Sequence, residues 1–293
     1  METMLTNFKP KKMKSSLTKK IVFTIVFIIF AFYTVTVLFP IVWSIISSLK
    51  TDDEYYARVF ALPQHWLFGN YIKAFKEFKV GETGMIGMIG NSLWLAFAFT
   101  FVSIMVSSAT AYVIAKYKFW GSKLIYSLAI FIQIIPIFGS FPATYRLIVG
   151  LGLNNPIGIV LTATGGFGFN FIMLTGFYRS VSWTYAEAAF MDGASDLKVY
   201  LRVIMPQAMP AITAIAIMGF IGNWNDYFTP LVYLKDNPTL ALGIYQFDII
   251  QQYRSNMPVY YCAIVISMIP VLLIFCFFQN TIMENTVAGG LKG

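Results

Sequence analysis

Charged residues are scarce in this chain of 293 residues. Only 12% of its residues are Asp, Glu, Lys or Arg, whereas soluble domains carry roughly 25%. Hydrophobic residues account for 58%, and several uncharged stretches reach about twenty residues, the length that a helix needs to cross a hydrocarbon core. This composition excludes an ordinary soluble domain and predicts an all-α membrane protein that crosses the bilayer several times.

Residue types that perform chemistry are also few. The single histidine, His65, has no second His or Cys and no paired carboxylate nearby, so we expect neither a metal site nor a catalytic site there. Cys262 and Cys276 fall in one apolar segment, roughly 20 Å apart along a helix, which is too far for a disulfide. The spans contain no paired carboxylates, no His-x-x-x-His and no Ser-His arrangement, which argues against an intramembrane enzyme.

A phosphate-binding loop is missing as well. No Gly-x-x-x-x-Gly-Lys-Ser/Thr occurs, so the chain itself does not bind ATP in that manner, and we expect no cofactor in it. A net charge of +8 could indicate a nucleic-acid partner, but the basic residues stand in short clusters beside apolar spans, as topology signals do. We therefore expect no nucleic-acid partner.

Six lysines within the first twenty residues precede the first apolar run, which predicts a cytoplasmic N-terminus by the positive-inside rule. Counting the apolar segments gives six transmembrane helices with both termini in the cytoplasm. The expected divisions are a cytoplasmic basic tail over 1–20, a first transmembrane helix over 21–49, an extracytoplasmic loop over 50–87, a transmembrane domain of five helices over 88–279 and a cytoplasmic tail over 280–293.

The five later spans are expected over about 88–115, 124–149 and 156–178, then from Pro206 past Asp226, and over 258–279. The fourth contains Gly165, Gly166 and Gly168, which we interpret as a packing or flexing feature because no Lys-Ser/Thr follows and no strand precedes them. In the outer loop, Tyr71, Phe75 and Phe78 recur at helical spacing and predict a short helix on the membrane surface or on a neighbouring subunit.

A polar island over about 180–205 interrupts the apolar pattern on the predicted cytoplasmic side. Thr184-x-x-Glu187 fits a capping box, so we expect a helix to begin there. Ala188 and Ala189 would let another surface approach closely, and Asp192-Gly193 indicates a turn.

The second half of the island predicts another short helix, and Pro206 suits the first turn of the fifth span. The apolar face of that helix would hold Leu197, Tyr200, Leu201 and Ile204. Two helices joined by a glycine turn favour a docking element for a partner protein. A plain cytoplasmic linker with two small helices is the alternative that these residues leave open.

The island resembles the EAA signature of permease subunits of binding-protein-dependent ABC importers. The resemblance is carried by Glu187-Ala188-Ala189-x-x-Asp192-Gly193-Ala194, followed by Val203 and Met205-Pro206. The family usually has Ile and Leu where this chain has Val203 and Met205, and the proline that commonly precedes the glutamate is replaced near Ser182. Asn223-Trp224-Asn225-Asp226-Tyr227, Thr239-Leu240-Ala241-Leu242-Gly243 and the ending Gly289-Gly290-Leu291-Lys292-Gly293 are similar to the maltose-type second permease of the carbohydrate branch.

This resemblance implies a type I ABC importer permease fold, and the island would be the coupling helix seated in a groove of a cytoplasmic ATPase. The implied ATPase contacts are Glu187, Ala188, Ala189, Asp192, Gly193, Ala194 and Pro206, together with Lys292 and Gly293 of the tail. It also implies an ATPase dimer that binds ATP and Mg²⁺, a second permease subunit, an extracytoplasmic solute-binding protein and a carbohydrate substrate, with this non-catalytic chain embedded in the cell membrane.

A solute path needs polar groups that face the interior of the bundle, because such groups are costly in lipid. The candidates are Gln133, Asn170, Asn223, Asn225 and Asp226, with Trp224 and Tyr227 offering flat faces for sugar rings. Trp and Tyr near the outer end of a span are also common interface anchors. Within transport, the alternative is a permease that imports amino acids, peptides or ions. A channel or a receptor is a further alternative, but it would give the polar island no function.

Overall fold

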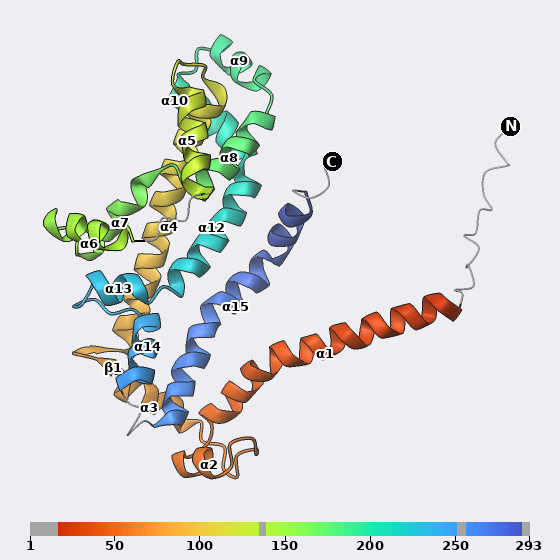
Figure 1. Ribbon diagram of the computed structural model, residues 1–293, viewed down its shortest axis with the longest axis vertical. Coiled ribbons are helices and arrows are strands. Elements are labelled where there is room, and N and C mark those ends of the chain that lie inside the picture. Colours follow the sequence, from red (N-terminus) through yellow and green to blue (C-terminus); the bar gives the residue numbers. More distant parts are fainter. Residues whose placement is uncertain (1–16, 135–138, 251–255, 289–293) are drawn as a thin grey trace.

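The computed structural model describes residues 17–134, 139–250 and 256–288, and most of them are helical (Figure 1). The helices are α1 Leu17–Ser48, α2 Asp52–Ala57, α3 Gly69–Glu77, α4 Met85–Lys116, α5 Ser122–Ile134, α6 Phe141–Gly150, α7 Pro156–Thr162, η1 Ala163–Gly165, α8 Phe169–Ser180, α9 Thr184–Met191, α10 Asp196–Val199, η2 Tyr200–Ile204, α11 Met205–Gln207, α12 Met209–Trp224, α13 Phe228–Tyr233, α14 Leu240–Ile250 and α15 Met257–Ala288.

Three helices of 32 residues each dominate the molecule: α1, α4 and α15. All three have windows apolar and long enough to cross a membrane. The helices α4, α8, α12 and α15 form an elongated bundle, with α9 and α10 at one end and α2 and α3 at the other (Figure 1). We call these the α9 end and the α3 end.

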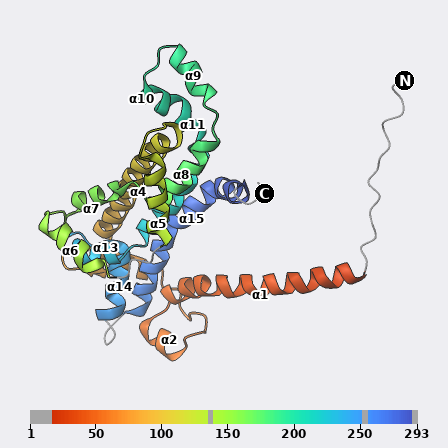
Figure 2. The same cartoon turned by 45° about the horizontal axis from the view of Figure 1, so that its top comes forward.

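Helix α1 leaves this bundle at the α3 end and extends away from it in both views (Figures 1 and 2). Its most apolar window has no residue buried inside the chain, and only its last turns pack on α15. There Trp43 meets the ring of Tyr261 edge-on at 5.2 Å. The free face of α1 is apolar, which fits contact with lipid or with another membrane subunit.

The predicted outer loop folds into a cap over the α3 end. The capping box predicted at Thr184 occurs here instead: the Glu54 N–H donates to the Thr51 hydroxyl, and the Thr51 N–H donates to the Glu54 carboxylate. The buried Lys50 ammonium donates to the carbonyls of Arg58 and Val59, at 3.0 and 2.8 Å. Burial lowers the pKa of this lysine.

The predicted helix around 71–78 is present as α3, but its packing differs from the prediction. Phe78 is buried and stacks on Phe247 at 5.2 Å, whereas Phe75 is exposed. The buried Asn70 amide ties α3 to the carbonyls of Ser48 and Lys50. The helix therefore packs inside its own chain, mainly on α15, followed by a two-residue antiparallel hairpin, β1 Lys79–Val80 with β2 Thr83–Gly84, which the sequence pattern missed.

The predicted third span over 124–149 is not observed as one helix. Helix α5 ends at Ile134 and α6 begins at Phe141, while residues 135–138 lie outside the described part of the chain. Helix α6 carries Pro142 in its first turn, where a missing N–H costs no hydrogen bond. With ten residues, α6 is about 15 Å long and is too short to cross a hydrocarbon core by itself.

The fourth and fifth spans are bent rather than straight. The fourth breaks between η1 and α8 by 46°, at Gly166 with φ +63°. A Cβ at Gly166 would make ordinary contacts with Val106 and Thr110 at 3.4 and 3.5 Å, so the positive φ rather than close packing favours glycine here. The Thr110 hydroxyl donates to the Gly166 carbonyl. Counting both bent pairs, the described residues provide up to five spans.

The sequence predicts that the fifth span begins at Pro206. In the structure it begins at Met209. Asp196–Gln207 meets α12 at 78°, and Pro206 lies in the short α11 before the bend. Pro210 lies in the first turn of α12, where its missing N–H costs no hydrogen bond. Ala208, with φ −87° and ψ −3°, lies at the bend between the two helices.

Candidate functional site

Helix α9 begins at Thr184, as predicted, but its cap differs from the predicted one. Trp183 is the N-cap residue and makes no side-chain capping bond, while the Ser182 hydroxyl pairs with Thr184. The prediction of a capping box at Thr184 and Glu187 is therefore wrong, because Thr184 is already part of the helix and is not its N-cap residue. Glu187 is exposed on the surface of the first turn, where a carboxylate favours the positive end of the helix dipole.

The turn at Gly193 is a Schellman motif that closes α9. The Gly193 N–H donates to the Phe190 carbonyl at 2.9 Å, and the Ala194 N–H donates to the Ala189 carbonyl at 3.0 Å. Gly193 has φ +77°, a conformation in which a Cβ would be strained. The predicted glycine turn is confirmed, and it fixes the direction in which the chain leaves α9.

The α9 unit, residues Thr184–Ala194, has a packed face and a free face. Ala186 is fully buried, and Ala189, Phe190 and Ala194 pack against the core around it. The opposite face is exposed and carries Tyr185, Glu187, Ala188, Met191 and Asp192. Met191, a large apolar side chain, is 89% exposed at the tip of the unit. This face is suited to bind a partner protein.

The segment after the turn departs from the predicted amphipathic helix. A short α-helix, α10, passes into the π-helix η2, in which the Met205 N–H bonds to the Tyr200 carbonyl. The wider helical turn changes which side chains share a face. Val199, Tyr200 and Ile204 are buried, whereas Leu197 and Leu201, predicted on the apolar face, are exposed.

Two polar contacts tie this unit to the end of α4. The Lys116 ammonium donates to the Val181 carbonyl just before α9. The Tyr117 hydroxyl donates to Asp196 Oδ1 at the start of α10. Burial, and next the bond to Asp196, raises the pKa of Tyr117, so this phenol remains a donor at physiological pH.

A buried tyrosine network continues this connection into the bundle. Ser108 Oγ lies 2.6 Å from the Tyr178 hydroxyl and accepts from the Tyr200 hydroxyl at 2.8 Å. The Tyr112 ring stacks on Tyr200 at 4.8 Å. Helices α4, α8 and η2 are thus held together by one set of hydroxyls. Sequence reasoning missed this set, although Ser108 and Tyr112 stand one turn apart in an apolar helix.

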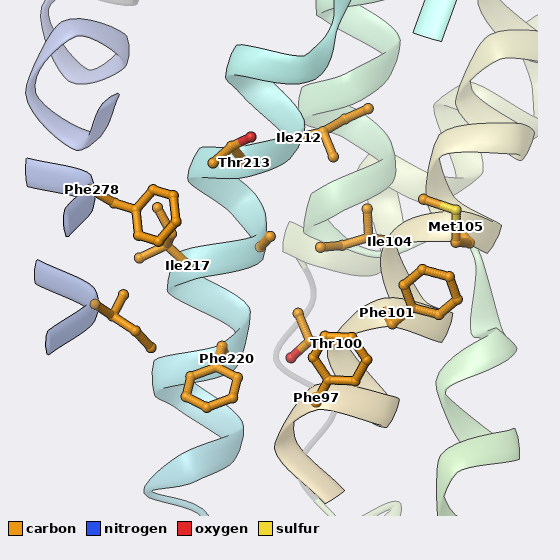
Figure 3. Close-up of a pocket in the computed structure, with 12 residues that line it drawn as sticks. Phe97, Thr100, Phe101, Ile104, Met105, Ile212, Thr213, Ile217, Phe220 and Phe278 are labelled. Carbon is orange, nitrogen blue, oxygen red and sulfur yellow. The ribbon is translucent and has the colours of Figure 1, made fainter. Parts of the chain in front are cut away.

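An apolar cavity of ≈ 280 Å³ lies between α4, α12 and α15 (Figure 3). Its wall is formed chiefly by aromatic and aliphatic side chains, with the Thr100 and Thr213 hydroxyls as the polar groups. The Asn223 amide donates to the Thr100 hydroxyl at 2.8 Å. A saccharide in this cavity would leave most of its hydroxyls without partners, so the cavity does not suit a sugar.

Three residues of the predicted solute path have structural contacts. Asn223 joins α12 to α4 through Thr100, and Trp224 is buried, with its indole N–H donating to the Ser267 carbonyl of α15. Asp226 Oδ1 accepts from the N–H groups of Phe228 and Thr229 and so caps α13. These three side chains fix the C-terminal end of α12.

The other predicted path residues are distributed along the bundle. Asn225 and Tyr227 border a pocket between α12, α14 and α15, and Trp224 forms part of its wall. Gln133 is exposed at the end of α5 beside Gly168, and Asn170 is half-buried near the start of α8. The structure therefore groups three of the seven candidates around one pocket. Lys292 and Gly293 lie outside the described residues.

Comparison with known proteins connects these features to a family. Residues 103–285 match the model of the binding-protein-dependent transport system inner membrane component. The diacetylchitobiose uptake system permease protein NgcG of Streptomyces coelicolor is 30% identical over 264 residues, which cover 89% of this chain and 86% of NgcG. The arabinooligosaccharides transport system permease protein AraQ of Halalkalibacterium halodurans is 25% identical over 267 residues, 90% of this chain and 94% of AraQ.

A solved structure has the same fold. A chain of a bacterial ABC transporter involved in the import of the acidic polysaccharide alginate aligns with a TM-score of 0.78 and 23% identity, covering 91% of this chain and 98% of that one. The matched segment 103–285 contains the α9 unit, the tyrosine network and most of the bundle. The chain belongs to the family of binding-protein-dependent transport system inner membrane components and is a multi-pass protein of the cell membrane.

Proposed function

We propose that this chain is a non-catalytic permease subunit of an ATP-driven importer that takes up a carbohydrate, most simply an oligosaccharide. The observation that carries the proposal is the α9 unit: an exposed face built on a rigid attachment to the bundle, within a family of transport components. The curated relatives NgcG and AraQ, named for saccharide uptake, support the substrate class.

In this proposal the free face of the α9 unit seats in a groove of a cytoplasmic ATPase that binds ATP and Mg²⁺. Glu187, Ala188, Asp192 and Gly193 face the ATPase, while Ala189 and Ala194 hold the unit on the bundle. Force on the unit passes through Tyr117, Asp196 and the tyrosine network to α4 and α8. The helices then switch between two packing arrangements, which open the solute path first to one side of the membrane and then to the other.

The proposed topology has six spans with both termini in the cytoplasm, so the α3 end faces outward. A second permease subunit covers the free face of α1, and a solute-binding protein delivers the carbohydrate at the α3 end. The crossing within 124–149 is the least regular of the six. Membrane-impermeant maleimide tests it in intact cells: H65C and L151C should be labelled, whereas M191C and K123C should not, with native Cys262 and Cys276 replaced.

Transport itself is tested with the assembled complex. The chain, expressed with its candidate ATPase and second permease, should copurify with both in mild detergent. After reconstitution, its solute-binding protein should stimulate ATP hydrolysis and drive uptake of a labelled saccharide from a panel of arabino-oligosaccharides, galacto-oligosaccharides and diacetylchitobiose. A chain that purifies alone and conducts solutes without ATP would contradict the proposal, and so would uptake restricted to amino acids or peptides.

A further inference from the structure

A pocket of ≈ 360 Å³ lies between the end of α12, α14 and α15. Helix α14 lies in the half of the bundle nearer the α3 end (Figure 1). Aromatic and amide side chains line it: Trp224, Asn225 and Tyr227 from the end of α12 and the residues after it, Tyr245 from α14, and Tyr260 from α15. Ser267 and three aliphatic side chains complete the wall. The volume lies within the range of roughly 300–1,000 Å³ usual for small-molecule sites.

The tyrosines of this pocket form flat surfaces. Tyr227 stacks on Tyr245 with ring centroids 4.3 Å apart and planes 21° from parallel. Tyr260 stacks on Phe247 at 5.3 Å with planes 8° from parallel, so its ring is held in a fixed orientation. A pyranose presents an apolar C–H face and a polar rim, and the negative face of an aromatic ring attracts such C–H groups.

Polar groups for the rim of a sugar are also available. Tyr227 is 40% exposed, and among the described residues neither its hydroxyl nor that of Tyr245 makes a hydrogen bond. The Asn225 amide nitrogen donates to the Ile221 carbonyl, which fixes the amide, and among the described residues its oxygen accepts no hydrogen bond. A hydroxyl-rich ligand would satisfy these groups, whereas a purely apolar ligand would leave them unpaired.

No Lys, Arg, Asp or Glu lines this pocket within the described residues. Asp226 stands between the lining residues Asn225 and Tyr227 in the sequence, but its Oδ1 accepts hydrogen bonds from the backbone of α13 instead. Among the described residues, a ligand carboxylate would find no counter-charge at this pocket and would enter at a high desolvation cost. A neutral saccharide encounters no such cost.

We infer that Tyr227, Tyr245, Tyr260 and Asn225 form a binding subsite for a neutral sugar ring at the outer mouth of the solute path. The inference rests on the proposed carbohydrate import and narrows it to uncharged saccharides. Trp224 supports the subsite from behind, because its indole is fixed on α15 through the Ser267 carbonyl. The subsite lies apart from the apolar cavity between α4, α12 and α15.

The test uses the complete complex in proteoliposomes with its solute-binding protein, and labelled arabino-oligosaccharide and diacetylchitobiose as probes. Replacing Tyr227 and Tyr245 together by alanine should raise the KM for the transported probe about tenfold, since two ring contacts are lost. Complex assembly, read by copurification, should remain intact. Y145A is the matched control: Tyr145 also stacks on a tyrosine, Tyr233 at 5.8 Å, but it does not line the pocket, and its KM should equal that of the unsubstituted complex.

Three results overturn the inference. These are an unchanged KM in the double variant, an equal rise in Y145A, and uptake of oligogalacturonate with a KM as low as that of the neutral probe. No saccharide uptake by the unsubstituted complex would instead refute the proposed carbohydrate import, so the two failures are distinguishable. The milder Y227F and Y245F variants retain the rings; retention of most of the affinity there supports stacking as the main contact.

Discussion

The hydroxyl of Tyr117 donates a hydrogen bond to Asp196 Oδ1, across 79 residues of sequence. Tyr117 immediately follows α4, and Asp196 begins α10, so the bond joins the long axis of the bundle to the segment after the α9 unit. Trp183, which immediately precedes α9 in the sequence, packs edge-on against the same tyrosine, with ring centroids 5.9 Å apart. Tyr117 thus contacts the chain both before and after the α9 unit.

Removing this hydroxyl should loosen the α9 unit without unfolding the bundle. Hydrogen bonds to charged groups contribute about 1.5–3 kcal/mol when buried, and this partly exposed one should contribute about 1 kcal/mol. Y117F should therefore increase hydrogen exchange over 182–199 and reduce transport more than ATP hydrolysis. A double-mutant cycle with D196N measures the coupling. Additive effects of the two substitutions would show that the bond carries no coupling.

Gly193→Val should uncouple transport from ATP hydrolysis. The left-handed backbone of this residue costs a non-glycine residue about 1–2 kcal/mol, and a β-branched side chain costs more. The Schellman turn would open, and the exposed face of α9 would change its orientation. Uptake should fall at least several-fold while the chain still inserts into the membrane.

Ser195→Val provides the control for this substitution. Ser195 is exposed, extended at φ −75° and ψ 159°, and makes no side-chain cap, so valine fits its backbone. Normal uptake in G193V would contradict the role of the turn. An equal loss in S195V would assign the effect to added bulk on the surface.

Ser108→Ala should lower the stability of the complex. Two buried tyrosine hydroxyls, those of Tyr178 and Tyr200, would lose a common partner, at a cost of roughly 2 kcal/mol. The apparent Tm in detergent should fall by a few degrees. Ser107→Ala, at an adjacent buried position whose side chain takes no part in this network, should have a much smaller effect, and equal shifts would contradict the network.

The cap over the α3 end should loosen on acidification. Hydrogen bonds from the N–H groups of Gln64 and Thr51 lower the pKa of Glu54 below its ordinary value of 4.5. A carboxylate with a depressed pKa stabilises the fold above the unfolded pKa and loses that contribution as the pH falls through the folded one. Hydrogen exchange over 51–64 should therefore increase below pH 4.5 in the native chain.

Glu54→Gln tests the assignment of this acid sensitivity. The variant should show faster exchange over 51–64 already at neutral pH, and little further change between pH 4.5 and lower values. Asp52 acts in the opposite sense: burial raises its pKa, so its contribution is greatest at low pH and is lost as the pH rises. An unchanged pH profile in E54Q would assign the sensitivity to another group.

The long helices and the island could be predicted from the sequence because each depends on local signals. Uncharged stretches predicted α1, α4 and α15, and Asp192-Gly193 predicted the turn that closes α9. What could not be predicted depends on contacts between distant segments. The π-helix at Tyr200 changes the helical period, so a pattern based on 3.6 residues per turn placed Leu197 and Leu201 on the wrong face.

The predicted solute path shows the same difference between local sequence signals and contacts that depend on the fold. Asn223, Trp224 and Asp226 were recognisable as polar or aromatic residues near the end of a span, but only the fold reveals that they bind Thr100, Ser267 and α13. Tyr245 and Tyr260 lacked any local signal, because their neighbour Tyr227 lies on another element of the chain. Two tetrads that both fit the capping-box pattern, Thr51 to Glu54 and Thr184 to Glu187, also differ in backbone conformation, and only the first forms the box.

The length of α4 has a further consequence. Its 32 residues extend about 48 Å, and even a tilt of about 40° leaves roughly 37 Å along the bilayer normal, against a hydrocarbon thickness of about 30 Å. One end of α4 therefore stands beyond the acyl chains, and the α9 unit is attached at Lys116 and Tyr117, where α4 ends. In the proposed topology this end of α4 is the cytoplasmic one, so the exposed Met191 and Ala188 would lie beyond the acyl chains, where a large water-soluble partner can reach them.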